Sequence, residues 1–175
     1  MESCLVVSAL GGNRPGIVKA LSKALAAHQA NISESRMSVL GGEFAVIMLV
    51  SASEEAIVAL EKDLPAMEAS LQLGISLKRT QPRAAAADIM PYEVSVVAMD
   101  HPGIVHDVTD FFAARALNIE SLETTSYAAA HTGTPMFSLA MVVGIPATVK
   151  VSELRNAFMD FCDELNLDAS LDLHV

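Results

Sequence analysis

The sequence of 175 residues contains little cysteine, few aromatic residues and a minority of basic ones. Its two cysteines, Cys4 and Cys162, form no C-x-x-C pair, so we predict reduced, buried thiols rather than a disulfide or a redox motif. Aromatic residues make up only 5% of the chain, which leaves few rings for stacking on nucleic-acid bases. Because the 11 Lys and Arg are scattered and the formal net charge is −10, we expect no direct binding to DNA or RNA.

Long apolar runs and targeting signals are also missing. The longest clean apolar run covers residues 44–50, far short of the roughly 20 residues of a membrane-spanning helix. Residues 1–10 lack the basic segment and the cleavage site of a signal peptide. We therefore expect a cytoplasmic protein with no membrane partner.

Motifs of catalysis and of metal or cofactor binding are absent from the sequence. It has no G-x-S-x-G, no Walker motif and no G-x-G-x-x-G. His101 and His106 are five positions apart, not the four of a helical metal pair, and the other histidines show no ligand spacing. We predict a non-enzymatic protein with no metal and no cofactor.

What the sequence does contain is an internal repeat. Residues 15–18, Pro-Gly-Ile-Val, recur at 102–105, and the Asn-Ile pair at 31–32 recurs at 118–119, both 87 positions later. The apolar positions of residues 57–73 recur at 151–167, 94 positions later. The second copy therefore has seven extra residues, and most of them fit at 128–135, opposite Gly41-Gly42.

Each copy predicts the order strand, helix, strand, strand, helix, strand. This is the ferredoxin-like βαββαβ arrangement of the α+β class, with antiparallel sheets. We predict a first domain over 1–80, a linker over 81–91 and a second domain over 92–175. The expected strands are 5–10, 31–40, 44–50 and 73–79 in the first copy, and 92–99, 118–128, 136–143 and 168–174 in the second. The expected helices start at the two Pro-Gly steps and at residues 54 and 149.

Several finer features follow from single residues. Pro15 suits the first turn of a helix, Pro65 should bend or restart the helix over 54–71, and Ser51, Ser53 and Ser152 are candidate helix caps. The strand over 44–50 does not alternate between apolar and polar residues. We therefore expect both of its faces to be covered, one by helices and the other by the second repeat or by another subunit.

The candidate site is the loop between the first strand and first helix of each copy. A helix N-terminus offers unpaired N–H groups to a carboxylate, and Gly16 or Gly103 would leave that backbone accessible. Asn13 or Asp100 could accept hydrogen bonds from an ammonium group. The alternative is that Pro-Gly merely starts the helix and that Asn13 or Asp100 caps it.

The Pro-Gly-Ile loop followed by Asn-Ile at the second strand resembles the ACT domain over nearly the whole chain. Two such domains with no attached enzyme resemble the glycine cleavage system transcriptional repressor family. ACT domains are regulatory modules that commonly bind amino acids near this loop and the second strand, often where two modules meet. The resemblance implies as ligand-binding residues Asn13, Arg14, Pro15, Gly16, Ile17, Asn31 and Ile32, and in the second copy Asp100, His101, Pro102, Gly103, Ile104, Asn118 and Ile119.

The expected function is that of an amino-acid-responsive transcriptional regulator of glycine cleavage or amino-acid metabolism. It would bind a small amino acid such as glycine, act through a regulatory protein partner and form a homo-oligomer. A ligand-free interaction module is the alternative, and the sequence does not separate the two. Asn31 and Asn118 could also be turn residues. An RNA-recognition domain is excluded by charge and composition. An acylphosphatase-type hydrolase would require Arg14 and Asn13 to hold a phosphate, and the second copy replaces both residues.

Overall fold

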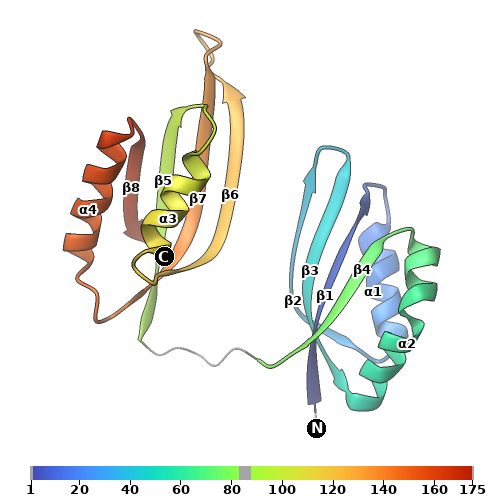
Figure 1. The fold of residues 1–175 in the computed structure, drawn as a ribbon. Coiled ribbons are helices and arrows are strands. Elements are labelled where there is room, and N and C mark those ends of the chain that lie inside the picture. The colour runs from blue at the N-terminus through green and yellow to red at the C-terminus, as the bar shows by residue number, and fades with distance from the viewer. Residues whose placement is uncertain (1, 83–87, 175) are drawn as a thin grey trace. The chain divides into compact units, whose positions relative to one another are not determined.

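Strands and helices follow one another in the same order twice along the chain. The structure is a computed structural model, describes residues 2–82 and 88–174, and divides into unit 1, Met1–Ala84, and unit 2, Ala85–Val175. Unit 1 comprises β1 (Glu2–Gly12), α1 (Ile17–Ala27), β2 (Asn31–Leu40), β3 (Glu43–Ser53), α2 (Glu54–Leu71) and β4 (Gly74–Thr80) (Figure 1). Unit 2 comprises β5 (Ile89–Met99), α3 (Ile104–Ala113), β6 (Asn118–Ala128), β7 (Pro135–Pro146), α4 (Val151–Glu164) and β8 (Asp168–Leu173).

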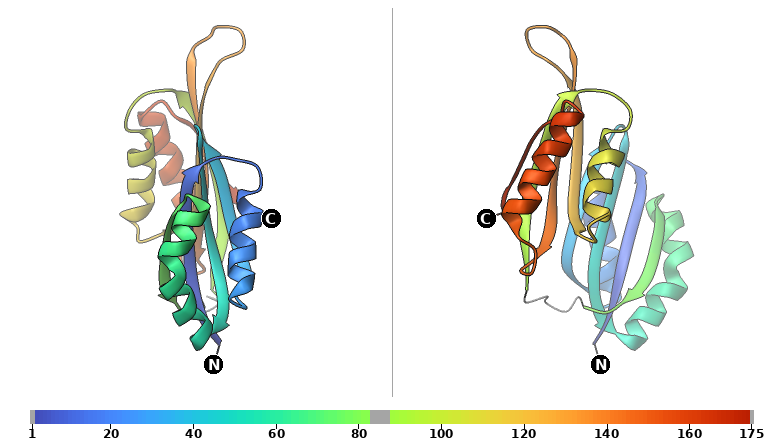
Figure 2. Two further views of the ribbon diagram at one scale, coloured as in Figure 1. Left: turned by 90° about the vertical axis from the view of Figure 1, so that its right-hand side faces the viewer. Right: turned by 60° about the vertical axis from the view of Figure 1, so that its left-hand side comes forward.

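Each unit forms one antiparallel sheet with the same strand order. The orders are β2-β3-β1-β4 in unit 1 and β6-β7-β5-β8 in unit 2. The two helices of a unit lie on one face of its sheet, as the left view of Figure 2 shows for unit 1, where the helix pair lies in front of the strands. The predicted ferredoxin-like βαββαβ architecture is confirmed.

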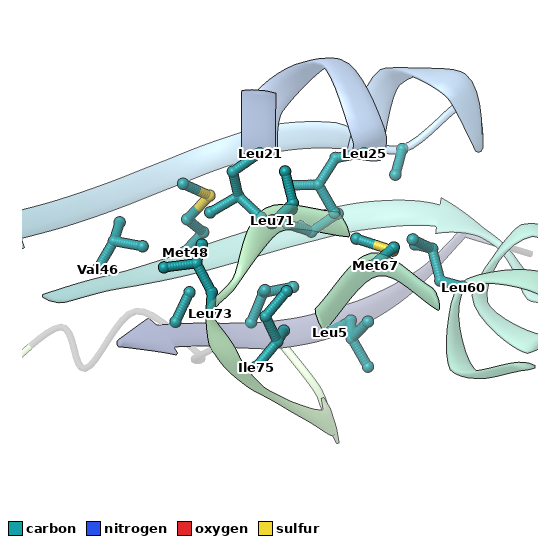
Figure 3. Close-up of a cluster of buried hydrophobic side chains, with 14 of the residues drawn as sticks. Leu5, Leu21, Leu25, Val46, Met48, Leu60, Met67, Leu71, Leu73 and Ile75 are labelled. Carbon is teal, nitrogen blue, oxygen red and sulfur yellow. The ribbon is translucent and has the colours of Figure 1, made fainter. Parts of the chain in front are cut away.

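Each core lies between the helix pair and the sheet. In unit 1, Leu21 and Leu25 of α1 meet Leu60 and Met67 of α2 above Met48 of β3, and all five are buried (Figure 3). Unit 2 uses aromatic rings in the same place. Phe111 and Phe112 of α3 pack against Phe158 of α4, with ring centroids 5.1 Å apart in each pair.

The outer face of β3 is open within unit 1. Phe44, Val46, Met48 and Val50 are buried beneath the helices, whereas Ile47 on the opposite face is 51% exposed. The burial therefore alternates although the sequence does not, and unit 1 by itself covers only one of the two faces. Cover of the second face by another repeat or subunit stays a prediction.

Two predictions about helix starts are wrong, and those for Pro65 and the linker are wrong in part. Pro15 lies two residues before α1, whose N-cap is Gly16. The α2 helix continues through Pro65, so a restart there is wrong, and a bend stays a prediction. Ser152 lies inside α4, whose N-cap is Lys150. Of the predicted linker 81–91, residues 83–87 lie outside the described residues and 89–91 belong to β5, because they pair with residues 144–146 of β7.

The serine caps were predicted at three positions, and one is confirmed. The hydroxyl of Ser53 accepts a hydrogen bond from the backbone N–H of Ala56 and so caps α2. Ser51 lies within β3.

At the cysteines, Cys4 is half-buried and Cys162 is fully buried, and burial raises the pKa of the Cys162 thiol to about 11.

Candidate functional site

The two candidate loops occupy equivalent places at one end of each sheet. The backbone N–H of Asn13 donates to the carbonyl oxygen of Gly42, 3.0 Å away, in the β2–β3 hairpin. In unit 2 the backbone N–H of Asp100 donates to the carbonyl oxygen of Pro135, 2.9 Å away, at the start of β7. The pairing fixes the start of each loop against the neighbouring hairpin, so the loop residues that follow emerge from a rigid sheet end.

A glycine with positive φ forms the N-cap of the helix in both loops. Gly16 has φ 84° and Gly103 has φ 106°, a conformation that residues with a side chain rarely adopt. Neither α1 nor α3 has a side-chain cap, so the prediction that Asn13 or Asp100 caps the helix is wrong. The first N–H groups of both helices thus remain available to an anion or to water.

The side chains that could bind an ammonium group are accessible. Asn13 and Asp100 are both exposed, and within the part of the chain that the structure describes neither side chain has a hydrogen bond or an ion pair. A carboxylate forms stronger hydrogen bonds with a cation than an amide does. The loop of unit 2 is therefore the better ammonium acceptor of the two.

Arg14 is directed away from the helix N-terminus. Its guanidinium donates to the carbonyl oxygen of Leu71 and, at 3.4 Å, to Oε1 of Gln72. These groups form the C-terminal end of α2, where the free carbonyls and the helix dipole attract a cation. The equivalent His101 makes only a local contact, with Nδ1 3.0 Å from the carbonyl oxygen of Pro102. Arg14 thus ties the loop to α2.

The remaining loop residues divide into exposed and buried ones. Pro15, Gly16, Pro102 and Gly103 are exposed. Ile17 and Ile104 are 4% and 2% exposed and belong to the two cores, so their side chains are unavailable to a ligand. Only their backbone N–H groups can take part in binding.

The Asn-Ile pairs lie at the opposite end of the sheet from the loop of the same unit. Gly12 pairs with Glu43 at one end of β3, whereas Asn31 pairs with Ser51, eight residues further along. At about 3.3 Å per residue, the two ends are roughly 26 Å apart. In unit 2, Asn118 likewise lies at the opposite end of the sheet from Asp100, and its Nδ2 donates to Oε1 of Glu120 at 3.0 Å. No single unit therefore brings its loop and its Asn-Ile pair together.

The Asn-Ile repeat has a structural role in both copies. It starts the second strand, directly before a bulge that lies between Ile32 and Glu34 in β2 and between Ile119 and Ser121 in β6. The residue two positions earlier, Gln29 or Ala116, has a positive φ of 56° and ends the preceding turn. The asparagines are thus first strand residues rather than turn residues.

Two charged residues near the loops were not recognised from the sequence. Lys19 lies in the first turn of α1, which has no acidic residue, whereas Asp107 lies in the first turn of α3. Oδ2 of Asp107 is 3.7 Å from the position that a Cβ on Gly103 would occupy. A charged residue about one turn after each Pro-Gly step could have indicated these residues from the sequence. A charge in the first helical turn changes how strongly the helix N-terminus binds an anion.

Three surface hollows of about 360 to 420 Å³ are lined by other residues than those predicted for the site. Two of them lie between α3 and α4, and one lies beside Leu10 and Gly74. Among the described residues there is no cluster of His, Cys, Asp or Glu suited to a metal ion. Residues 2–82 and 88–174 also contain no helix long and apolar enough to cross a bilayer.

Known proteins share both the sequence and the fold. A family model described as the ACT domain matches residues 3–78. The glycine cleavage system transcriptional repressor of Escherichia coli (strain K12) is 33% identical over 169 residues, 97% of this chain and 89% of that protein. A crystal structure of an unknown protein from Galdieria sulphuraria has a TM-score of 0.82 at 33% identity, with 100% of both chains covered. Another, of a candidate glycine cleavage system transcriptional repressor, has a TM-score of 0.74 at 28% identity, covering 99% of this chain and 98% of that one.

The repeated βαββαβ units and their glycine-capped loops define a tandem ACT-domain protein, as the sequence predicted. The agreement with the Escherichia coli protein extends over both units. The chain belongs to the family of the glycine cleavage system transcriptional repressor.

Proposed function

We propose that the chain is an amino-acid-responsive regulator of glycine cleavage or related amino-acid metabolism, which acts in the cytoplasm through a protein partner and without catalysis. The observation that carries the proposal is the 33% identity, over 97% of the chain, to a protein named for repression of the glycine cleavage system. The net charge of −10 disfavours contact with DNA. A repressor that does not bind DNA must act on a protein that does.

The proposed amino-acid contacts are at the glycine-capped loops. The exposed Asp100 carboxylate suits the ammonium group of the ligand. A ligand carboxylate suits the free N–H groups of a helix start, and here the loops differ. At Gly103 it would face the Asp107 carboxylate, whereas at Gly16 it would lie near Lys19. The loop of unit 2 is therefore the better amine site, and the loop of unit 1 the better carboxylate site.

Isothermal titration calorimetry of the full chain with each common amino acid, glycine and serine first, tests the ligand. The proposal expects saturable binding of one or a few of them. A gel-shift of the purified chain with promoter DNA at moderate salt tests the mode of action and should show no complex. A tight, sequence-specific shift without a partner would overturn the proposed dependence on a protein.

A ligand-free interaction module is the second candidate. It is favoured by the burial of Ile17 and Ile104, by the contacts of Arg14 with α2, and by the distance of Asn31 from the loop, because these leave few predicted groups for a ligand. The absence of binding heat for every amino acid would support it. An acylphosphatase-type reaction has little support, since Arg14 is already bound to α2 and is not free to hold a phosphate.

A further inference from the structure

The charge of the chain is concentrated in unit 2. Residues 85–175 hold 13 of the 21 acidic residues and three of the 11 basic ones, and therefore the whole formal charge of −10. Residues 1–84 hold eight of each kind. The expectation that the basic residues are scattered is therefore wrong at the level of the two units, and any electrostatic attraction of a cationic partner is directed to unit 2.

In unit 1 the acidic residues of α2 have partners within the unit. Arg79 binds Glu54 and, with Nε 2.9 Å from Oε1, also Glu61. Asp63 accepts from Nε2 of His28 at 2.9 Å, which joins α2 to α1. These carboxylates are partly neutralised before any other molecule approaches.

In the corresponding helix pair of unit 2, Glu153 forms an ion pair with Lys150, but the other acidic residues are not paired in the part of the chain that the structure describes. Asp110 of α3 and Asp160 and Glu164 of α4 are exposed, and among the described residues none of the three forms an ion pair. They border a hollow of about 420 Å³ whose other lining includes the rings of Phe111 and Phe161. Phe111 is only 5% exposed, so the accessible apolar lining comes from Phe161 and the neighbouring alanines. Three acidic residues and one basic residue, Arg115, surround it.

The internal repeat explains why the hollow exists. The positions of Ala24, His28 and Asp63 in unit 1 correspond to Phe111, Arg115 and Ala157 in unit 2. His28 and Asp63 bridge their helices, whereas Ala157 offers Arg115 no carboxylate. The Arg115 guanidinium instead lies over the Phe111 ring, with Cζ 3.6 Å from the centroid. The two helices of unit 2 are therefore not bridged at this point.

A second hollow extends the first one along the helices. It has a volume of about 410 Å³, shares Arg115 and Ala157 with the first, and continues over Leu117 and Leu154 toward the start of α4, where Lys150 and Glu153 form an ion pair at its edge. The two adjoining hollows are together named the α3–α4 groove. Their lining runs along α4 from Lys150 to Glu164, roughly 21 Å at 1.5 Å per residue, which suits an elongated partner rather than a compact small molecule.

We propose that the α3–α4 groove docks a basic amphipathic helix of a partner protein. The apolar side of that helix would rest on Ala114, Ala157 and Phe161, and its Lys or Arg side chains would meet Asp110, Asp160 and Glu164. Charge complementarity selects this occupant, because an acidic helix would meet repulsion from the rim and from the whole of unit 2. The inference rests on the proposed function only in requiring a protein partner, and it does not depend on an amino-acid ligand.

The test uses the full chain, isotope-labelled for NMR, and a synthetic 18-residue peptide with Leu on one helical face and Lys on the other. Shifts should concentrate on α3 and α4, and the Kd should rise with salt. Asp160→Lys should weaken binding about fivefold, since a rim charge pair is lost and a repulsion replaces it. Asp168→Lys makes the same charge change at the start of β8 and should change the Kd less than twofold. A peptide with Glu in place of Lys should not bind.

Ala157→Asp tests the shape of the groove. It installs the carboxylate that unit 1 has at this position, so it should bind Arg115, close the groove and weaken the Leu/Lys peptide at least as much as Asp160→Lys does, in protein with an unchanged melting curve. Equal losses in Asp160→Lys and Asp168→Lys, or shifts spread outside α3 and α4, would overturn the proposal. Amino-acid binding is read at residues 13–17 and 100–104 in the same spectra, so its failure is distinguishable from failure of docking.

Discussion

Replacement of Arg14 separates a structural role from a ligand-binding one. In Arg14→Met the aliphatic stem remains, but the hydrogen bonds to the Leu71 carbonyl and to Gln72 are lost. A hydrogen bond from a charged group contributes about 1.5–3 kcal/mol, and the partial exposure of this one reduces that to about 1–2 kcal/mol. The free energy of unfolding should fall by that amount. With roughly 4–8 °C per kcal/mol for a unit of this size, Tm should fall by roughly 5–15 °C.

Urea unfolding followed by far-UV circular dichroism measures the loss, and calorimetry with whichever amino acid binds measures the affinity. His101→Ala is the matched control, because His101 occupies the same loop position in unit 2 and makes only a local contact. It should change stability by less than about 0.5 kcal/mol. Unchanged stability in Arg14→Met, together with a large loss of affinity, would refute the assignment of Arg14 to α2.

Three further predictions concern the site, the open sheet face and pH. Asp100→Ala should weaken amino-acid binding roughly ten- to a hundredfold, measured by calorimetry, and Asn13→Ala should weaken it less, since a carboxylate binds an ammonium group more strongly than an amide does. Ile47→Asp should abolish any self-association seen by light scattering without lowering Tm, because Ile47 lies on the open face of β3; unchanged association would show that this face is not an interface. Hydrogen bonds to the Ala24 carbonyl and to Asp63 raise the pKa of His28 above 6.5. The stabilisation that these hydrogen bonds give to the folded state should therefore be complete below pH 6.5 and disappear as pH rises through the raised pKa. Asp63→Asn should flatten that dependence of the urea midpoint, and an equally steep dependence in this variant would contradict the assignment.

The fold was predictable because both copies repeat the same spacing of apolar residues and turns. The second strands were placed correctly at 31–40 and 118–128, since each is bounded by an Asn-Ile start and a turn. Most other strands were predicted too short, because cross-strand hydrogen bonds extend them into segments with weak strand propensity, such as 89–91. Ser152 was mistaken for a cap because helix starts depend on the backbone conformation of the preceding residue, here the extended Lys150.

The site was predictable only in part. The glycine-capped loops follow directly from the Pro-Gly steps, and their positive φ fits the choice of residue. The contact of Arg14 with Leu71 joins residues 57 positions apart, and no local pattern records it. The separation of Asn31 from the loop depends on the strand register, which pairs Asn31 and Gly12, the residue before the loop, with opposite ends of β3.

The placement of both tyrosines in strands of unit 2 also gives the chain an unequal optical signature. Both tyrosines, Tyr92 and Tyr127, lie in β5 and β6, and the sequence contains no tryptophan. Tyrosine fluorescence and near-ultraviolet tyrosine bands therefore report on unit 2 alone, while the far-ultraviolet signal reports on both units. A denaturant titration followed with the two signals in parallel yields separate midpoints for the two halves of an unmodified chain. The difference between the two midpoints is then compared in the presence and absence of a bound molecule. A change in that difference measures the thermodynamic coupling between unit 1 and unit 2.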